Sequence, residues 1–456
     1  MMQQIFPVRG RGRMPLLPLL IGALLIAAPL PAAAQQPPVT ADSEARPELP
    51  LLTLDEALRL AMAGNPRILI ARNEATVAAN NHTIGNAGYL PSLNLTALQS
   101  RRTGIGGPEV DGGGVGTLDF STSLGYTLFD GFRRGATYRR LGVIEEQVEI
   151  GAERVTENTL AALAVLYFDI VRQQQQIEVL RESIQISEER LRIAEMRRDV
   201  GSASELEVRR AQVDRNADRA ALLRQEVALT ASKAALNELL ARDRSPDYRV
   251  ADSIPIDRSL ALEELAETAL RGNRTLLEAE RGQQIAELER REVRSEWYPR
   301  VGLQLGYSMA DLSNQLGFVP TQPNGLAYGL TVSFNLFDGL NRERRLQNAR
   351  LRQQSSDLAM RQARTQVLTG LETAHASYRN RVLLADLEAE NEQLARQNVE
   401  VALERFRLGL STSVELREVQ NALAAASSRL VATRFEAKQA ELELLRLSGE
   451  LLERYR

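Results

Sequence analysis

Few side chains in this sequence could carry out acid–base, nucleophilic or metal chemistry. The chain has no cysteine and two histidines, His82 and His375, each inside a segment with a helical pattern. Without cysteine there is no thiolate nucleophile, no disulfide and no Cys-bearing zinc site. Two histidines so placed support neither a Ser-His-Asp triad nor a metal pair. We expect no catalytic residue, no cofactor and no metal, and we expect the chain not to be an enzyme.

Acidic residues follow a glycine that ends a long helical pattern. Glu415 lies six residues after Gly409, and Glu418 lies one helical turn further on. Thr412 precedes Glu415 at the spacing of a capping box, and Ser204–Glu207 has the same spacing. Carboxylates on helices of this kind usually belong to solvated faces. Helix capping is therefore the plainer interpretation of Glu207 and Glu415.

A glycine-rich stretch from Gly104 to Gly116 resembles a phosphate-binding loop only in composition. It lacks the GxxxxGK[ST] pattern and the helix that must follow it. We expect it to be a loop between two strands.

Charge is nearly balanced over the 456 residues, with 56 basic and 59 acidic side chains, so no overall field favours nucleic acid. Residues 1–34 predict a cleaved export signal, because three arginines precede an apolar run and Ala32-Ala33-Ala34. A membrane anchor is the alternative, but Pro18, Pro29 and Pro31 interrupt that run. Residues 35–52 are proline-rich and predict an extended N-terminal arm.

The rest of the sequence is an internal repeat with an offset of 208 residues. The matching pairs are Leu54-Asp55-Glu56 with Leu262-Glu263-Glu264, Gly64-Asn65 with Gly272-Asn273, Tyr89-Leu90-Pro91 with Trp297-Tyr298-Pro299, Leu128-Phe129-Asp130-Gly131 with Leu336-Phe337-Asp338-Gly339, and Gly201 and Glu207 with Gly409 and Glu415. An offset held without slippage indicates duplication of a structural unit. We expect repeat one at 53–242, a linker at 243–261 and repeat two at 262–456.

Each repeat opens with a helical pattern that reaches Gly88 in the first copy and Glu296 in the second, with a break near Gly64-Asn65-Pro66. Thr53 fits a capping box, whereas Ala261 at the matching place cannot cap a helix. Pro91 and Pro299 then end the helices, because the residue before a proline favours extended backbone.

A β-hairpin follows in each repeat, at about 90–128 and about 299–337. Apolar residues alternate with small or polar ones, as in Val301, Leu303, Leu305 and Tyr307. Strands of about 10 residues with one apolar face are typical of a lipid-facing barrel. A half-buried strand of a soluble sheet is the alternative, but the export signal and the regularity of all four strands favour the membrane.

Aromatic residues gather at the helix-proximal strand ends, where an interfacial girdle would lie. They are Tyr89, Phe129, Trp297, Tyr298 and Phe337. Packing in a core is the alternative role for these rings.

After Asp130-Gly131 and Asp338-Gly339 a helical period holds for roughly 65 residues, or about 100 Å. Asp130 and Asp338 are placed to cap these helices. Apolar residues then recur every seven positions, turn at Gly201 or Gly409, and return. The outward rows are Leu163, Ile170, Ile177, Ile184 and Leu191, and Leu387, Leu394, Val401 and Leu408; the return rows are Leu206, Val213, Ala220, Val227 and Ala234, and Leu416, Leu423, Leu430, Ala437 and Leu444. We expect coiled-coil hairpins at about 131–242 and about 339–449, followed by a short tail.

Four strands cannot close a barrel, and an open edge in lipid leaves backbone groups unpaired. Other copies must complete it, either two copies with eight strands or three with twelve. A duct favours three, because side chains fill an eight-stranded barrel.

The sequence resembles the TolC family of outer-membrane efflux and secretion proteins over about residues 52 to 450. The residues that carry the resemblance are Leu54-Asp55-Glu56-Ala57-Leu58, Gly64-Asn65-Pro66, Gly88-Tyr89-Leu90-Pro91-Ser92, both Leu-Phe-Asp-Gly turns, and Phe406-Arg407-Leu408-Gly409 leading to Val414-Glu415-Leu416. The resemblance implies a homotrimer in the outer membrane, with a twelve-stranded β-barrel continuous with a helical periplasmic tunnel. It also implies a periplasmic adaptor and an inner-membrane pump of the RND, ABC or MFS type, which supplies the energy.

The resemblance gives the hairpin tips a role. Adaptor docking is implied for Gly201, Ser202, Gly409, Leu410 and Ser411, and a constriction of the entrance for Glu415 and Glu418. We expect these two carboxylates to favour cations. Ser411 stands where the best-known member carries a latch arginine, and the counterpart of Glu418 in repeat one is Arg210. We therefore expect gating where the two copies diverge.

Two other classes remain open. A periplasmic coiled-coil adaptor or scaffold would usually have one helical hairpin and soluble β domains, whereas this chain predicts two hairpins and four membrane-length strands. A simple diffusion porin would not need helices of this length.

Overall fold

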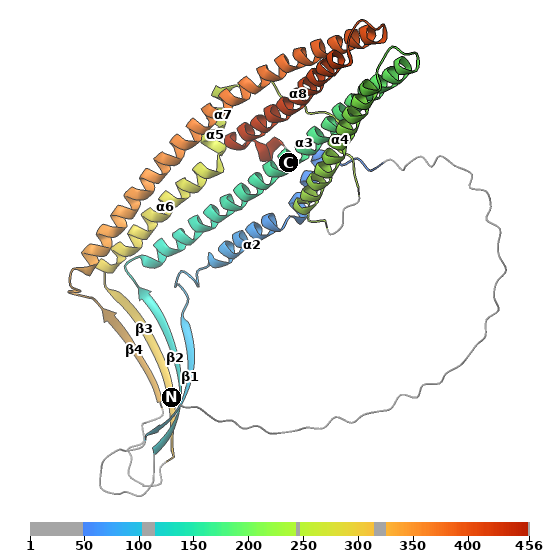
Figure 1. The fold of residues 1–456 in the computed structure, drawn as a ribbon. Coiled ribbons are helices and arrows are strands. Elements are labelled where there is room, and N and C mark those ends of the chain that lie inside the picture. The colour runs from blue at the N-terminus through green and yellow to red at the C-terminus, as the bar shows by residue number, and fades with distance from the viewer. Residues whose placement is uncertain (1–48, 103–114, 243–246, 314–324, 455–456) are drawn as a thin grey trace, which may run out of the picture. The chain divides into compact units, whose positions relative to one another are not determined.

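The computed structural model describes residues 49–102, 115–242, 247–313 and 325–454 (Figure 1). The predicted export signal, residues 35–48 of the arm and most of the glycine-rich loop lie outside the described residues. The last residues of the arm are held by the linker, because the Leu52 amide donates to the Arg249 carbonyl at 2.8 Å.

The elements follow the same order in both repeats. They are α1 (Leu54–Gly64), α2 (Pro66–Asn81), β1 (Ser92–Arg102), β2 (Val115–Phe129), α3 (Arg133–Asp199) and α4 (Glu205–Leu239), then α5 (Leu262–Gly272), α6 (Arg274–Arg294), a 3-10 turn at Ser295–Trp297, β3 (Arg300–Ser313), β4 (Gly325–Ser333), α7 (Asn341–Arg407), α8 (Ser413–Ser448) and α9 (Leu451–Arg454). No helix among these is both long and apolar enough to cross a membrane.

The first helices of each repeat break at an asparagine. Asn65 Oδ1 accepts from the Arg67 amide and caps α2, while its Nδ2 donates to the Leu239 carbonyl at 2.7 Å. Asn273 caps α6 in the same way and donates to the Leu447 carbonyl at 2.8 Å. Leu447 lies 208 residues after Leu239, so the sequence repeat is also a repeat of tertiary contacts.

One predicted helix boundary is wrong. The helical run of repeat one ends at Asn81 and does not reach Gly88. Residues 83–88 form turns that close with the Tyr89 amide donating to the Ile84 carbonyl, and Gly88 has φ +83°. A positive φ cannot continue a right-handed helix, so Gly88 turns the chain toward β1.

The two long helices, α3 and α7, have 67 residues each. The Asp130 carboxylate accepts from the Arg134 amide at 3.1 Å, and Asp338 accepts from the Asn341 amide at 3.0 Å, as the capping prediction requires. Gly131 has φ +69°, and a Cβ there would lie 2.5 Å from the Ser295 carbonyl oxygen. Glycine is therefore required at this turn.

The strands form one antiparallel sheet in the order β1–β2–β3–β4. Alternate leucines such as Leu95 and Leu330 are exposed on one face. β4 stops at Ser333, four residues before the predicted end at about 337, because its last partner is Arg300 and the preceding Pro299 has no amide hydrogen to donate. Within the described strands, β1 and β4 are each paired along one edge only.

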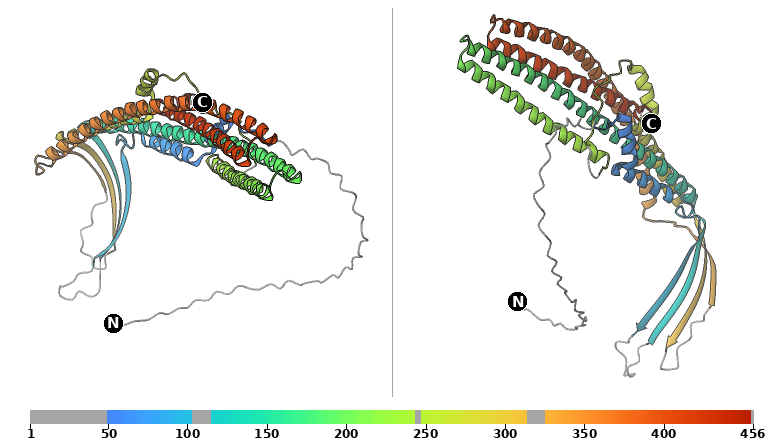
Figure 2. Two further views of the ribbon diagram at one scale, coloured as in Figure 1. Left: turned by 45° about the horizontal axis from the view of Figure 1, so that its top comes forward. Right: turned by 90° about the vertical axis from the view of Figure 1, so that its right-hand side faces the viewer.

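The helices lie side by side in a fixed order. α2, α3, α6 and α7 neighbour one another in that sequence, and α4, α3, α8 and α7 do so nearer the hairpin tips (Figures 1 and 2). The largest buried cluster joins both repeats and the linker around α3. It includes Leu58, Leu163, Tyr167, Ile170, Leu236, Tyr248, Val250, Leu442 and Leu445.

The predicted helical hairpins form, with α3 against α4 and α7 against α8, but the seven-residue rows do not all pair within their own hairpin. The rows on α3 and α8 are mainly buried, with Leu163 and Leu416 inaccessible. Leu394 on α7 and Val213 on α4 are 52% and 67% exposed, and the other large residues of those two rows are exposed as well. The sequence period identified the rows correctly but could not show which surface each row meets.

Candidate functional site at the hairpin tips

The hairpin tips, residues 197–207 and 405–415, have the same backbone design. Gly201 and Gly409 have φ of 78° and 76°. The Ser202 amide donates to the Arg197 carbonyl at 2.7 Å, and the Leu410 amide donates to the Arg405 carbonyl at 2.8 Å. These are the reverse bonds of a glycine helix stop, so each long helix ends on its glycine.

The returning helices begin at the two predicted capping boxes. Ser204 Oγ accepts from the Glu207 amide at 3.3 Å, and Thr412 Oγ1 accepts from the Glu415 amide at 3.2 Å. The hydroxyl half of each box is thus present. Because the cap uses the backbone amide of Glu415, its exposed carboxylate remains available for another role.

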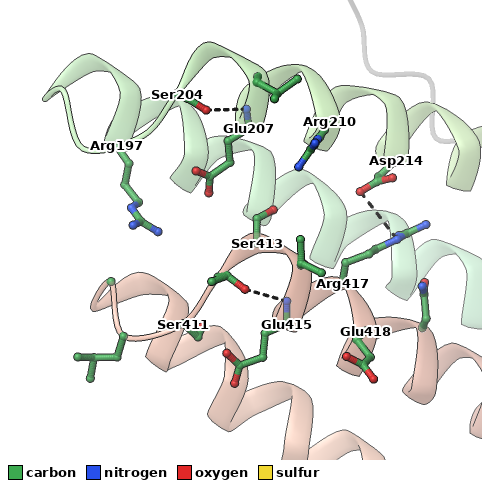
Figure 3. A pocket seen from close by; sticks show the side chains of 16 residues that line it. Arg197, Ser204, Glu207, Arg210, Asp214, Ser411, Ser413, Glu415, Arg417 and Glu418 are labelled. Carbon is green, nitrogen blue, oxygen red and sulfur yellow. Dashed lines mark hydrogen bonds and ion pairs between the residues drawn. The ribbon is translucent and has the colours of Figure 1, made fainter.

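A cavity of about 770 Å³ lies between the two tips (Figure 3). It brings together both predicted constriction residues, Glu415 and Glu418, with the divergent Arg210. In Figure 3, Glu207 and Arg210 reach toward the second hairpin, whereas the carboxylates of Glu415 and Glu418 point away from the first. Gly409, Leu410 and Ser411 also line the cavity, but Gly201 and Ser202 do not.

An ion-pair network, of which Asp214 and Arg417 line this cavity, was not predicted from the sequence. Arg417 on α8 donates to Asp218 on α4 through Nη1 at 2.8 Å and Nη2 at 3.0 Å. Arg190 on α3 is fully buried and donates to Asp214 at 2.7 Å. The two arginines and two aspartates balance in charge, and they join the first hairpin to the second.

The pKa values of Arg190 and Arg417 are shifted in opposite directions. Burial lowers the pKa of Arg190, whereas the hydrogen bond to Asp218 raises the pKa of Arg417. Both remain cationic, since arginine is not deprotonated in proteins. Gln420 completes the layer by donating to the Ser183 carbonyl and the Ser187 hydroxyl, each at 2.7 Å.

A second contact ties α7 to α3 close to the tips. Arg407 donates to Glu189 at 2.9 Å, and Glu189 also pairs with Arg192. The bond from Arg192, followed by that from Arg407, lowers the pKa of Glu189 to about 2. Arg396 pairs with Glu182 further along the same two helices.

A comparison of the two repeats was the one sequence signal for this network. At the 208-residue offset, Asp214 and Asp218 correspond to Ala422 and Ala426, and Arg190 corresponds to Asn398. The matching position of Arg417 is Arg209. Charge is therefore lost at three of four counterpart positions, as it is reversed between Glu418 and Arg210.

The predicted aromatic residues lie at the junction of strands and helices. Phe129 and Tyr298 both meet Phe132 edge to face, with ring centroids 5.4 and 5.9 Å apart. The Arg342 guanidinium lies 4.9 Å from the Trp297 ring, and Arg134 lies 5.1 Å from that of Tyr89. Phe337 is largely exposed.

The histidines have local partners. His82 Nδ1 lies 2.6 Å from Glu145 Oε2, and His375 Nε2 lies 3.3 Å from the Leu260 carbonyl oxygen. Among the described residues, no group of three or more His, Cys, Asp or Glu is placed to hold a metal ion.

The profile of one protein family, described as outer membrane efflux protein, matches the chain twice, at residues 57–242 and 265–450. Both ends of the second match lie 208 residues after those of the first (265 − 57 and 450 − 242). The chain belongs to the outer membrane efflux protein family. The recognised family unit is thus the repeat itself, with its β-hairpin and helical hairpin.

Two known relatives align with this chain over most of their length. The chain is 27% identical over 410 residues to protein CyaE of Bordetella pertussis, covering 88% of this chain and 84% of the relative. It is 25% identical over 413 residues to the outer membrane efflux protein BepC of Brucella suis, covering 88% and 86%. The crystal structure of VceC from Vibrio cholerae has the same fold, with a TM-score of 0.72 at 17% identity over 87% of this chain and 96% of that one.

Membership of the outer membrane efflux protein family places the chain in the outer membrane and gives it a transport function. It is a channel protein that provides an exit duct from the cell. Members of the family form trimers and work with an adaptor and an inner-membrane pump. The alternative of a periplasmic adaptor is therefore set aside.

Proposed function

We propose that three copies of this chain form one passive export duct, closed at the periplasmic end by the hairpin tips and energised by a separate pump. Repeat one (53–242) and repeat two (262–456) each supply one strand pair and one helical hairpin, so the trimer has approximate sixfold symmetry. The observation that carries the proposal is the sheet: β1 and β4 each have one unpaired edge within the described strands. Pairing β4 of one copy with β1 of the next would close a barrel of twelve strands.

Lipid would surround this barrel. Exposed leucines and aromatics on the strands support this, as does the girdle position of Tyr89, Phe129, Trp297, Tyr298 and Phe337 beside the helices. The transitions from helix to strand and back would fall at the interface. Their residues are Pro91, Pro299, Asp130, Gly131, Asp338 and Gly339.

The tips would receive the adaptor. Leu410 is 66% exposed at a glycine turn, and Gly201, Ser202 and Gly409 are exposed beside it. Ser411 is buried at 8% exposure, so of the five predicted docking residues it alone lies beneath this surface. The pump behind the adaptor would be of the RND, ABC or MFS type. Exposed apolar residues on a turn favour a protein partner over water.

Glu415 and Glu418 would narrow the duct at its periplasmic entrance and favour cations. Both carboxylates are exposed at the start of α8, within reach of the tip cavity. Their exposure at the cavity leaves both negative charges facing solvent, where a passing cation would meet them.

The proposal is tested with the full-length chain purified from outer membranes. Unheated samples should migrate as a trimer in SDS gels and boiled samples as a monomer, because a closed barrel resists the detergent. The trimer should give single-channel currents in planar lipid bilayers. A monomer in both lanes, or a trimer that conducts no ions after the tips are loosened by the Arg417→Ala substitution, would refute an export duct.

A further inference from the structure

The seam between the two repeats inside one chain is ionic along α3 and α6. Four ion pairs cross it, and each joins one residue of α3 to one of α6. They are Arg140–Glu292 at 2.7 Å, Arg154–Glu278 at 3.0 Å, Glu153–Arg274 at 3.1 Å and Glu146–Arg281 at 2.7 Å. The pairing of residue 140 with 292 and 154 with 278 shows that the helices run antiparallel.

The 208-residue offset predicts which residues would face each other in a contact between two copies of the chain. α2 is the counterpart of α6, and α7 is the counterpart of α3. Within the chain α2 and α7 are the two outer members of the row of four helices (Figures 1 and 2). If copies continue the repeat, α7 of one copy meets α2 of the next as α3 meets α6.

The counterpart seam carries no pair of opposite charges at these positions. The four observed ion pairs become Asn348 with Ile84, Gln362 with Ile70, Arg361 with Pro66, and Gln354 with Asn73. Ile84 lies in the turns beyond the end of α2, so three of these pairs keep the register of one helix on the other. Every α7 residue among these is exposed, and Ile70 is 57% exposed. The contact between α3 and α6 inside the chain is ionic. The corresponding faces of α2 and α7, at the two outer edges of the row of helices, are largely neutral and partly apolar.

The apolar residues on these two faces also match in position. Glu278 packs so closely over Gly151 that a Cβ there would lie 3.0 Å from its Oε1. At the 208-residue offset Gly151 becomes Ala359 and Glu278 becomes Ile70. In the contact between copies the methyl group of Ala359 would therefore face the hydrocarbon side chain of Ile70. Val77, two turns along α2, would fall midway between the exposed Leu351 and Leu358.

Near the tips, part of the exposed row of α7 lies at the counterpart of a contact made inside the chain. On α3, Val179 and Ile186 line the contact with α8, beside Gln420 and Leu423. Their counterparts on α7 are Leu387 and Leu394, both exposed. The offset directs them to the counterparts of Gln420 and Leu423, which are Gln212 and Arg215 on α4 of the next copy, so apolar residues of α7 meet polar residues of α4 at this end of the seam.

We propose that copies of this chain join through a largely neutral, apolar seam in which Leu358 and Gln362 on α7 of one copy pack around Ile70 on α2 of the next, in the register of Arg154 on Glu278. The surface and its occupant, a second copy, follow from the unpaired outer helices and the repeat offset. The inference rests on the proposed trimer, and it adds the residues, the register and the chemistry of the contact.

The test transplants the internal ion pair into the external seam. Ile70→Glu alone places a carboxylate in an apolar contact at each of three seams, so the temperature at which the trimer band dissociates in SDS gels should fall by about 2–4 °C or more. Adding Gln362→Arg should restore most of that loss, because it rebuilds the Arg154–Glu278 pair between copies. Thr369→Arg, two turns further along the same exposed face, is the matched control and should restore little.

Cross-linking gives a second test that does not depend on the stability of a charged variant. The chain has no native cysteine, so Ile70→Cys with Gln362→Cys provides the only thiols. A bismaleimide should yield covalent dimers and trimers, and each single variant should remain monomeric after boiling. Equal rescue by Gln362→Arg and Thr369→Arg, or no cross-linked ladder in a trimer that still forms and conducts, would overturn the seam. A wild-type chain that never forms a trimer would instead overturn the proposed function.

Discussion

Arg417 and Asp218 lie 199 positions apart in sequence and form a two-bond ion pair that joins the second helical hairpin to the first. Their side chains are 22% and 13% exposed, so water screens the pair only in part. Arg190 and Asp214 lie beside them, and a single layer therefore holds α3, α4 and α8 together. This layer fixes the mutual position of the two tips that form the cavity.

Removing Arg417 should destabilise the tip. We expect Arg417→Ala to lower the free energy of unfolding by about 2–3 kcal/mol, less than the cost of breaking a fully buried pair, because Asp218 keeps some access to water. Thermal or denaturant unfolding followed by circular dichroism measures the change. Arg209, the counterpart in repeat one, is 73% exposed, and Arg209→Ala should change stability by less than about 0.5 kcal/mol. Equal losses in the two variants would contradict the structural role of Arg417.

Glu157 should make stability depend on pH near neutrality. This carboxyl is 3% exposed on α3, and burial raises its pKa to about 7 despite the nearby Arg274 and Arg446. The folded chain therefore holds this proton more tightly than the unfolded chain, in which the pKa is about 4.5. The stabilisation is complete below pH 4.5 and is lost as the pH rises through about 7, a change of about 3 kcal/mol. The Glu157→Gln variant should lack this dependence and should be more stable than the parent at pH 8, as measured by denaturation midpoints at about pH 5 and about pH 8.

The two helix-start glycines should differ in their tolerance of alanine. Both have positive φ, so an added Cβ costs about 1–2 kcal/mol at either position. At Gly131 that Cβ would also lie 2.5 Å from the Ser295 carbonyl oxygen, whereas at Gly339 the nearest atom is 3.6 Å away. We expect Gly131→Ala to lower stability by about 2–4 kcal/mol and Gly339→Ala to cost only the backbone strain. Indistinguishable melting temperatures would show that the two turns do not differ in this way.

Sequence periodicity predicted the repeated order of helices and strands because each element buries or exposes residues at its own fixed spacing. The Asp130 and Asp338 caps and the Gly201 and Gly409 turns were predictable for the same local reason. Local patterns could not assign partners. The exposed row at Leu394 has the same spacing as the buried row at Leu163, and only tertiary packing distinguishes them.

The ion pairs at the tip escaped prediction for a related reason. Arg417 and Asp218 come from different hairpins, and nothing in either local sequence marks them as partners. A comparison of the repeats marks these positions as divergent, since the aspartates become alanines in repeat two, but it does not show which residues pair. At the tips, repeat one and repeat two therefore differ in the residues that make long-range polar contacts.

The acidic entrance provides the sharpest test of the tip as a gate. Replacing both Glu415 and Glu418 by Gln removes two negative charges per copy while keeping side-chain size. Gln also satisfies the capping box at position 415, so the start of α8 should persist. We expect the cation-to-anion permeability ratio in planar bilayers to fall toward one, as read from the reversal potential across a KCl gradient, because the local potential at the entrance becomes less negative. Glu207→Gln, at the counterpart of Glu415, is the control. It should change the permeability ratio less, because Glu207 is directed at the second hairpin, whereas Glu415 and Glu418 are directed away from the first (Figure 3). An unchanged reversal potential in the double variant would remove these two carboxylates from the conduction path.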